Sequence, residues 1–243
     1  MTAAASRPAR LAYKLLNALE TVLALPLSAV DIVDFEPPLT SLDDRSEVPW
    51  SSRPLLERKA FPNGVALDER RTLLAVAYTS RQRVDVYALE DPDSSSSIRD
   101  SLMLLHDRKP NASLQMPFAV DNLAFAPTSE GRDHETLVAT GHANFPALLR
   151  LVRDSHAIAP SWVVAIEVNS TGQPVVGSNS AAQGDTAPVK IASRVSNSSG
   201  GVKTLFQSSG ERFSSSTTGV ILAGGDLLVT GLYASEGIIV CTA

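Results

Sequence analysis

The sequence of 243 residues is poor in cysteine and in aromatic residues, with one cysteine and an aromatic content of 5%. So few aromatic side chains do not favour a stacking platform for single-stranded nucleic acid. The net charge of −5 and the lack of an extended Lys/Arg cluster also argue against a nucleic-acid partner. No uncharged apolar run reaches about 18 residues, so a membrane-spanning helix is not expected.

The single cysteine, Cys241, lies close to the C-terminal end. One interpretation is a free thiol that packs as a small apolar side chain. The other is one half of a disulfide whose partner lies elsewhere. A nucleophilic role would need a neighbouring His or a helix N-terminus to activate the thiol, and no local pattern supplies one.

Apolar residues make up 44% of the chain, enough for a sizeable core. The first segment, residues 1–27, predicts an amphipathic helix that ends before Pro26. Its apolar residues fall on one face: Leu11, Leu15, Leu16, Leu19, Val22 and Leu23. This face either packs on the body of the domain or makes peripheral contact with a membrane or lipid surface through Leu11–Leu25. Lys14 and Glu20 interrupt the apolar stretch, so a cleaved signal peptide is not predicted.

Residues 28–243 predict a different architecture, made of many short strands separated by turn residues and without helices. The β-rich runs are Ala29–Phe35, Leu55–Ala60, Leu73–Tyr78, Val84–Leu89, Leu102–Leu105, Leu123–Phe125, Leu137–Thr140, Leu148–Val152, Val163–Val168, Val189–Ala192, Val202–Phe206, Gly219–Leu222, Leu227–Thr230 and Ile238–Cys241. A polar insert of low predicted order covers about 169–201. This spacing indicates an all-β sandwich or a β-propeller of about three to four blades.

Three short polar segments adjoin these predicted strands. Asn63 lies in a Pro-Asn-Gly turn, and His142 follows a strand. Asp121 and Asn122 stand at the head of another strand. Taken singly, each has an ordinary structural explanation, because Asn-Gly and Asp-Asn pairs are common in turns. Taken together, they bring carboxylate and amide oxygens to successive strand ends, and calcium prefers such ligands. Zinc is not indicated, because no second His or Cys lies at ligand spacing.

The order of these segments is similar to a known pattern. The segments Phe61-Pro62-Asn63-Gly64, Val120-Asp121-Asn122, Gly141-His142-Ala143-Asn144, Ser215-Ser216-Thr217-Thr218 and Val240-Cys241 occur in this sequence. Together they resemble the second half of the paraoxonase/arylesterase family of calcium-dependent ester and lactone hydrolases. The resemblance implies a partial six-bladed β-propeller, preceded by the N-terminal helix, around a catalytic calcium ion.

Further expectations about the site follow from this resemblance. Asn63, Asp121 and Asn122 would be metal ligands, and Asp121 and His142 would be catalytic. The substrate would be a small ester or lactone. The protein would be secreted or membrane-associated, with candidate glycosylation sequons at Asn111, Asn169 and Asn197.

The first half of the family's pattern, with further calcium ligands and the partner of the terminal cysteine, has no counterpart in this sequence. The sequence therefore predicts a truncated member of the family. Two alternatives stay open. One is a non-catalytic β-propeller fragment that acts as a binding or structural module. The other is a propeller similar to gluconolactonase or strictosidine synthase, because Asn-Gly and Asp-Asn segments recur across that superfamily.

Overall fold

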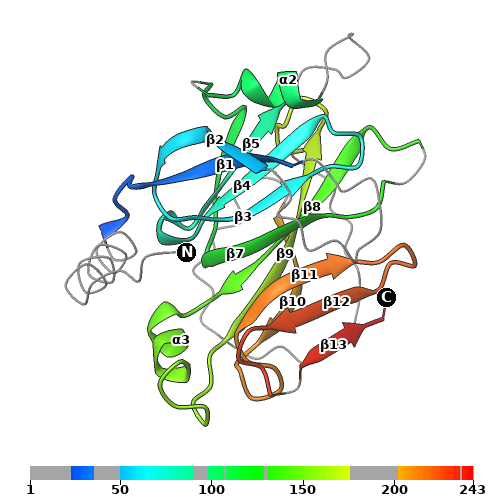
Figure 1. Cartoon of the computed structure of the whole chain (residues 1–243). Helices are drawn as coiled ribbons and strands as arrows, with labels where there is room; N and C mark the ends of the chain where they lie inside the picture. The colour runs from blue at the N-terminus through cyan, green and yellow to red at the C-terminus, as the bar shows by residue number, and fades with distance from the viewer. Residues whose placement is uncertain are drawn as a thin grey trace, which may run out of the picture.

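The computed structural model describes residues 23–35, 50–89, 98–106, 108–128, 131–175, 202–235 and 237–242. Antiparallel strands dominate these ranges, which confirms the predicted all-β class (Figure 1). The strands are β1 (Ser28–Phe35), β2 (Trp50–Lys59), β3 (Pro62–Leu67), β4 (Leu73–Tyr78), β5 (Arg83–Ala88), β6 (Ala112–Gln115), β7 (Ala119–Phe125), β8 (His134–His142), β9 (Ser161–Asn169), β10 (Val202–Ser208), β11 (Ser216–Ile221), β12 (Leu227–Gly231) and β13 (Ile238–Cys241).

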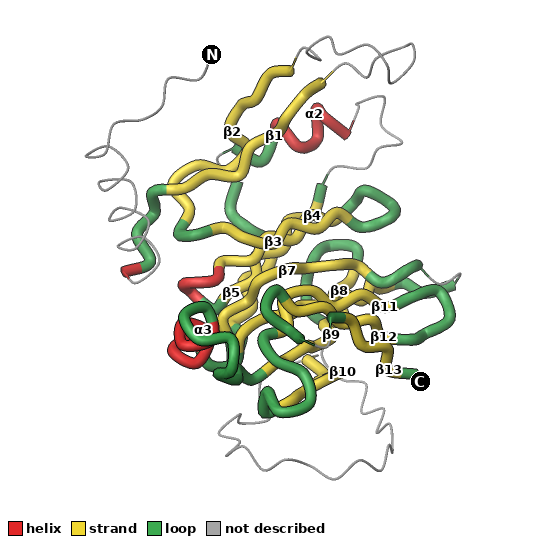
Figure 2. Tube along the Cα trace, turned by 60° about the horizontal axis from the view of Figure 1, so that its bottom comes forward, coloured by secondary structure: helices red, strands yellow, loops and turns green. Residues whose placement is uncertain are grey.

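Within the described residues these strands form four antiparallel sheets, and in each sheet a strand pairs with the next one along the chain. The sheets are the β1–β2 pair, two four-stranded sheets (β3–β6 and β7–β10) and the three-stranded sheet β11–β13. The first strands of the last three sheets lie together, because β7 packs against both β3 and β11 (Figure 2). The polar segments identified in the sequence lie on these three strands and on β8.

The sheets are separated by apolar layers. One layer, between the β3–β6 and β7–β10 sheets, includes Ala75, Phe118 and Ile166. A second layer, which includes Leu56, Tyr78 and Tyr87, packs against the other face of β3–β6, where β1, β2 and the short helix α2 (Ile98–Met103) contribute. A third layer joins β7–β10 to β11–β13 and includes Val138, Phe213 and Val229. Because the β3–β6 sheet is covered on both faces, every residue of β4 is buried.

Two of the predicted strands are helical instead, and the prediction that the chain after residue 27 lacks helices is therefore wrong. Leu102–Leu105 forms the end of α2 and the turn that follows it, and Leu148–Val152 belongs mostly to α3 (Phe145–Leu151). The N-terminus of α3 is capped by Asn144, whose Oδ1 accepts a hydrogen bond of 3.0 Å from the backbone N–H of Ala147. Apolar runs this short do not distinguish a strand from a helix by periodicity.

Several predictions lie partly or wholly outside the described residues. These are the helix over Leu11–Leu25 except for its last residues, the strand Val189–Ala192 and the sequon at Asn197. Of the predicted insert, residues 169–175 are described, and there the Asn169 Oδ1 accepts a hydrogen bond of 3.0 Å from the backbone N–H of Thr171 in a turn. Among the described helices, none combines the length and the apolar character needed to cross a membrane.

Cys241 ends β13, where it pairs with Leu227 of β12. Its side chain packs against the apolar layer formed by Val138, Phe213 and Val229, and this burial raises the pKa of the thiol. Packing among apolar side chains is what the interpretation as a small apolar side chain predicts. The chain has no second cysteine with which Cys241 could form an internal disulfide.

Candidate functional site

Two of the polar segments lie in β-bulges at the start of neighbouring strands. Pro62 of β3 pairs with Tyr78 and Val65 pairs with Val76, so β3 has one more residue than β4 across this interval. The same irregularity occurs in β7, where Val120 pairs with Gly141 and Leu123 pairs with Ala139. The extra residues fall within Asn63-Gly64 and Asp121-Asn122. A bulge redirects side chains, and bulges are common next to active sites.

The predicted turn at Asn63-Gly64 is therefore wrong, because both residues lie inside β3. Gly64 is required for a different reason, the close approach of two backbones. A Cβ at Gly64 would collide with the carbonyl oxygen of Asp121 and would lie 2.8 Å from the Cα of Asn122. The absence of a side chain at Gly64 thus lets β3 and β7 touch at the two bulges. Asp121 and Asn122 likewise lie within β7, which begins at Ala119, and not before the strand.

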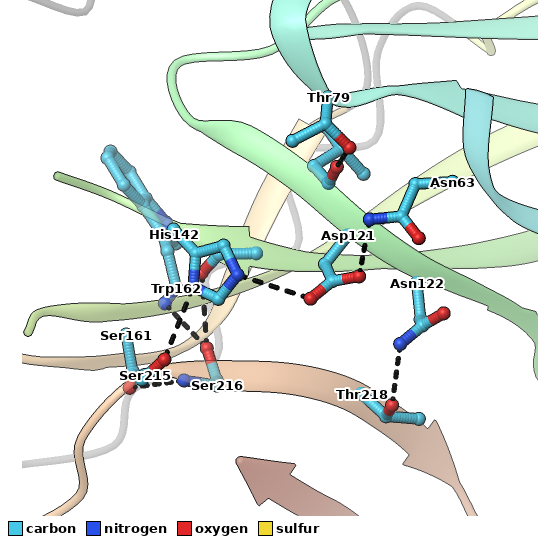
Figure 3. A network of polar contacts seen from close by, with 12 residues as sticks. Asn63, Thr79, Asp121, Asn122, His142, Ser161, Trp162, Ser215, Ser216 and Thr218 are labelled. Atoms are coloured by element: carbon cyan, nitrogen blue, oxygen red, sulfur yellow. Dashed lines mark hydrogen bonds and ion pairs between the residues drawn. The ribbon is translucent and has the colours of Figure 1, made fainter. Parts of the chain in front are cut away.

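The side chain of Asp121 lies at the centre of a polar network (Figure 3). The Asn63 Nδ2 donates a hydrogen bond of 2.8 Å to the Asp121 Oδ1. On the other side, the His142 Nε2 lies 3.2 Å from the Asp121 Oδ2. The His142 side chain is almost fully buried at 6% exposure, the Asp121 side chain is 15% exposed, and Asn63 lies at the surface. The site thus runs from solvent at Asn63 to a buried imidazole at His142.

Asn122 extends in another direction, toward the third sheet. Its Nδ2 donates a hydrogen bond of 3.0 Å to the Oγ1 of Thr218 in β11. The structure thus brings Asn63, Asp121 and His142 into direct contact, whereas Asn122 is adjacent to Asp121 in the chain but bonded to β11 (Figure 3). Because the Asn122 Nδ2 donates to Thr218, the amide oxygen of Asn122 remains available to a ligand.

Thr79 holds the two bulged strands in place, and the sequence did not indicate it. This buried residue begins the short 3₁₀ helix Thr79–Arg81. Its Oγ1 donates a hydrogen bond of 2.6 Å to the carbonyl oxygen of Val120, just before the β7 bulge. Its backbone N–H donates one of 3.3 Å to the carbonyl oxygen of Phe61, just before the β3 bulge. Thr79 therefore fixes the spacing between Asn63 and Asp121.

The start of β11 contributes a second group that the sequence did not place in the site. Ser215 precedes β11, and its Oγ lies 3.5 Å from the Nδ1 of His142. The adjacent Ser216 Oγ donates a hydrogen bond of 3.2 Å to the carbonyl oxygen of Gly141. These residues belong to the Ser215–Thr218 segment that the family resemblance identified. Nothing in the local sequence connects them to His142, which lies 73 positions earlier.

The donor chemistry of the site suits a hard cation. Asn63 and Asn122 offer neutral amide oxygens, and Asp121 offers a carboxylate; these are the ligand types that calcium takes. Each Asp121 oxygen already accepts one contact, from Asn63 or His142, and each keeps a further lone pair. Among the described residues, no three His, Cys, Asp or Glu side chains gather as a metal-binding group. The site thus offers one carboxylate and two amides, which are ligand types that calcium accepts.

The chain was also compared with known proteins. No protein-family model matches it, and a search of curated proteins returns no relative.

Proposed function

We propose that this chain carries the site of a calcium-dependent hydrolase of aryl esters or lactones, similar to the paraoxonases and arylesterases. The observation that supports this most directly is the position of the Asp121 carboxylate. It lies between the Asn63 amide of β3 and the His142 imidazole of β8, so the proposed metal-binding carboxylate would lie beside an imidazole that can carry a proton.

The arrangement of the sheets supports the proposed propeller. In a propeller, meandering antiparallel sheets pack face to face around a central axis, with the first strand of each sheet innermost. The β3–β6, β7–β10 and β11–β13 sheets meander in this way, and their first strands lie together. We propose that these three sheets and the β1–β2 pair are about three to four blades of a six-bladed ring, with the candidate site at its axis.

In this proposal Asn63, Asp121 and Asn122 would hold the calcium ion. When bound, calcium supplies Lewis acidity that polarises the oxygen of an ester or lactone carbonyl. The chain's own residues then have separate roles. The Asn63 and Asn122 amides orient the site, Asp121 orients the attacking water and accepts its proton, and His142 holds a proton at Nε2 beside the Asp121 Oδ2.

A combined binding and turnover experiment tests the proposal. The purified chain is titrated with calcium by calorimetry and assayed with phenyl acetate and with an aliphatic lactone, in calcium and in chelator. We expect calcium binding, and hydrolysis that the chelator abolishes. Asp121→Asn is expected to lose both, whereas Glu211→Gln, which removes one exposed carboxylate elsewhere, is expected to keep both. Chelator-insensitive hydrolysis, or calcium binding unchanged in Asp121→Asn, would contradict the proposal.

A second candidate function is a non-catalytic β module that binds or supports another molecule. The observation that favours it is the charge of the site, because Asp121 is the one carboxylate among the proposed ligands. Tight calcium sites use about six to eight oxygens, commonly with several carboxylates. A folded chain with neither calcium binding nor turnover would support this second candidate. Hydrolysis of the lactone without hydrolysis of phenyl acetate would instead favour the gluconolactonase-like alternative.

A further inference from the structure

Ser215 faces the imidazole of His142 from the side opposite Asp121. Its Oγ lies 3.5 Å from Nδ1, whereas the Asp121 Oδ2 lies 3.2 Å from Nε2 (Figure 3). Ser215 is fully buried, and His142 is 5% exposed. Both ring nitrogens of a buried histidine thus have a polar neighbour, a hydroxyl on one side and a carboxylate on the other.

The backbone of Ser215 is held in a conformation that disfavours serine. Its φ is +56°, in the left-handed region where every residue except glycine is strained. The neighbouring contacts maintain this conformation. The Ser215 backbone N–H donates to the carbonyl oxygen of Ala159 at 3.0 Å, and the Ser214 Oγ accepts from the Ala159 N–H at 2.9 Å. A glycine would satisfy this backbone without strain, so the hydroxyl of Ser215 calls for a separate explanation.

The contacts of His142 explain why residue 215 carries a hydroxyl group. Because Asp121 is an acceptor, the neutral imidazole carries its proton on Nε2 and donates it to Oδ2. The Nδ1 is then an acceptor, and the Ser215 hydroxyl is the donor that faces it. The Ser215 hydroxyl is therefore placed to hold the imidazole in this tautomer and orientation.

We infer that Ser215 is a positioning residue, which holds the His142 ring with Nε2 directed at Asp121. The effect on the His142 ring follows from geometry alone; its use in hydrolysis rests on the proposed function. A nucleophilic role for Ser215 does not fit the same geometry, although Ser, His and Asp follow one another as in an acyl-transfer triad. Full burial closes the Ser215 hydroxyl to a substrate, and a nucleophile must reach one.

The inference is tested by nitrogen NMR of the histidine rings in the full chain labelled with ¹⁵N. His142→Gln identifies the resonances of His142 among the four histidines of the sequence. Ser215→Gly removes the hydroxyl and the backbone strain, and Ser215→Ala removes the hydroxyl alone. In both variants we expect the Nδ1 resonance of His142 to shift to that of an imidazole nitrogen without a hydrogen-bond donor. The other three histidines are expected to stay in place.

Gln82→Gly is the matched control, because Gln82 also has a left-handed φ, of +49°, but is exposed. It relieves similar strain and is expected to leave the His142 resonances unmoved. An unchanged Nδ1 resonance in both Ser215 variants would overturn the inference.

Turnover separates this inference from the proposed function. If the chain hydrolyses phenyl acetate, Ser215→Gly should lower kcat by roughly ten- to a hundredfold while the Tm stays equal or rises. Full kcat in Ser215→Gly would overturn the inference. If the wild-type chain has no turnover, the proposed function fails, and the Nδ1 resonance still decides the role of Ser215.

Discussion

Asp121 accepts a hydrogen bond on one carboxylate oxygen from Asn63 and contacts His142 with the other. Two properties of the Asp121 side chain can therefore be tested separately. One is its shape, which fits the contacts with Asn63 and His142, and the other is its negative charge, which a cation would require. An amide in place of the carboxylate keeps most of the shape and removes the charge. Substitutions at this position therefore distinguish a structural role from a metal-binding role.

We predict that Asp121→Asn lowers calcium affinity at least about tenfold and changes the free energy of unfolding by less than about 1 kcal/mol. The amide oxygen still accepts from Asn63, and the amide NH2 can donate to the His142 Nε2 once the imidazole proton moves to Nδ1, where the Ser215 hydroxyl can accept it. Asp121→Ala is expected to lose about 1–3 kcal/mol, since it leaves the buried Nε2 of His142 without a partner. Urea unfolding followed by tryptophan fluorescence, together with calorimetry, measures both quantities. Equal calcium affinity in the wild type and in Asp121→Asn would show that the carboxylate is not a ligand.

The residues of the site differ in how far the sequence could identify them. Asn63, Asp121, Asn122 and His142 are polar residues beside apolar runs, and the order of their segments, which resembles a known family pattern, selected them. The local sequence does not mark the roles of Thr79 and Ser215, because their partners lie 41 and 73 positions away. Serine and threonine are common in loops, so only the folded arrangement separates these two from the other hydroxyl residues.

At the scale of the elements, the close contact between β3 and β7 is the feature that assembles the site. Gly64 lies against the backbone of Asp121 and Asn122, and both strands bulge where they meet. The sequence predicted a turn at Asn63-Gly64, and the requirement for glycine there comes instead from the contact with β7. The lack of space at Gly64 follows from the packing of β3 on β7, so it cannot be inferred from the sequence around Gly64 alone.

We predict that Gly64→Ala destabilises the protein by at least about 1–3 kcal/mol, because the added methyl group forces β3 and β7 apart. The same change should weaken calcium binding, since it moves Asn63 relative to Asp121. Gly224→Ala is the matched control, because a Cβ at that position meets nothing within 4 Å. Thermal unfolding and calorimetry of both variants make the comparison. Similar stability of the two variants would contradict the tight approach of β3 to β7.

The start of helix α3, in contrast, is marked by a local sequence signal. Asn144 followed by Pro146 is an ordinary helix start, with a capping side chain and a proline in the first turn. The apolar residues after them were instead interpreted as a strand. The strands of the hairpins β4–β5 and β11–β12 were predicted close to their observed positions, because turn residues separate two apolar runs in each.

At the scale of the whole molecule, stability depends on apolar layers between stacked sheets, and polar groups are buried within them. Tyr78 and Tyr87 lie in the layer beneath β1 and β2. Burial raises the pKa of both phenols above the ordinary value of 10.0, and the nearby carboxylate of Asp85 adds to this. The guanidinium of Arg83, over the ring of Tyr78, acts in the opposite direction but less strongly.

We predict that the free energy of unfolding falls steeply above about pH 10. The unfolded chain releases the two phenol protons near that pH, whereas the folded chain retains them. The stabilisation is thus complete below the unfolded pKa and is lost as the pH rises, by about 1.4 kcal/mol per pH unit for each tyrosine. Tyr78→Phe should remove about half of this slope, as measured by urea unfolding from pH 8 to 11. Tyr233→Phe, at a residue 43% exposed, should leave the slope unchanged. A slope unaffected by Tyr78→Phe would contradict the assignment.

The sequence by itself determined the all-β class, the position of most strands and the residue types of the candidate site, because strand runs, turn residues and polar side chains are local properties of the chain. The tertiary structure decided how these parts meet. The stacking of the sheets, the contact at Gly64 and the hydroxyls of Thr79 and Ser215 each depend on residues far apart in the chain. Such contacts form only when apolar faces of separate sheets pack together, and no local pattern encodes the resulting distances.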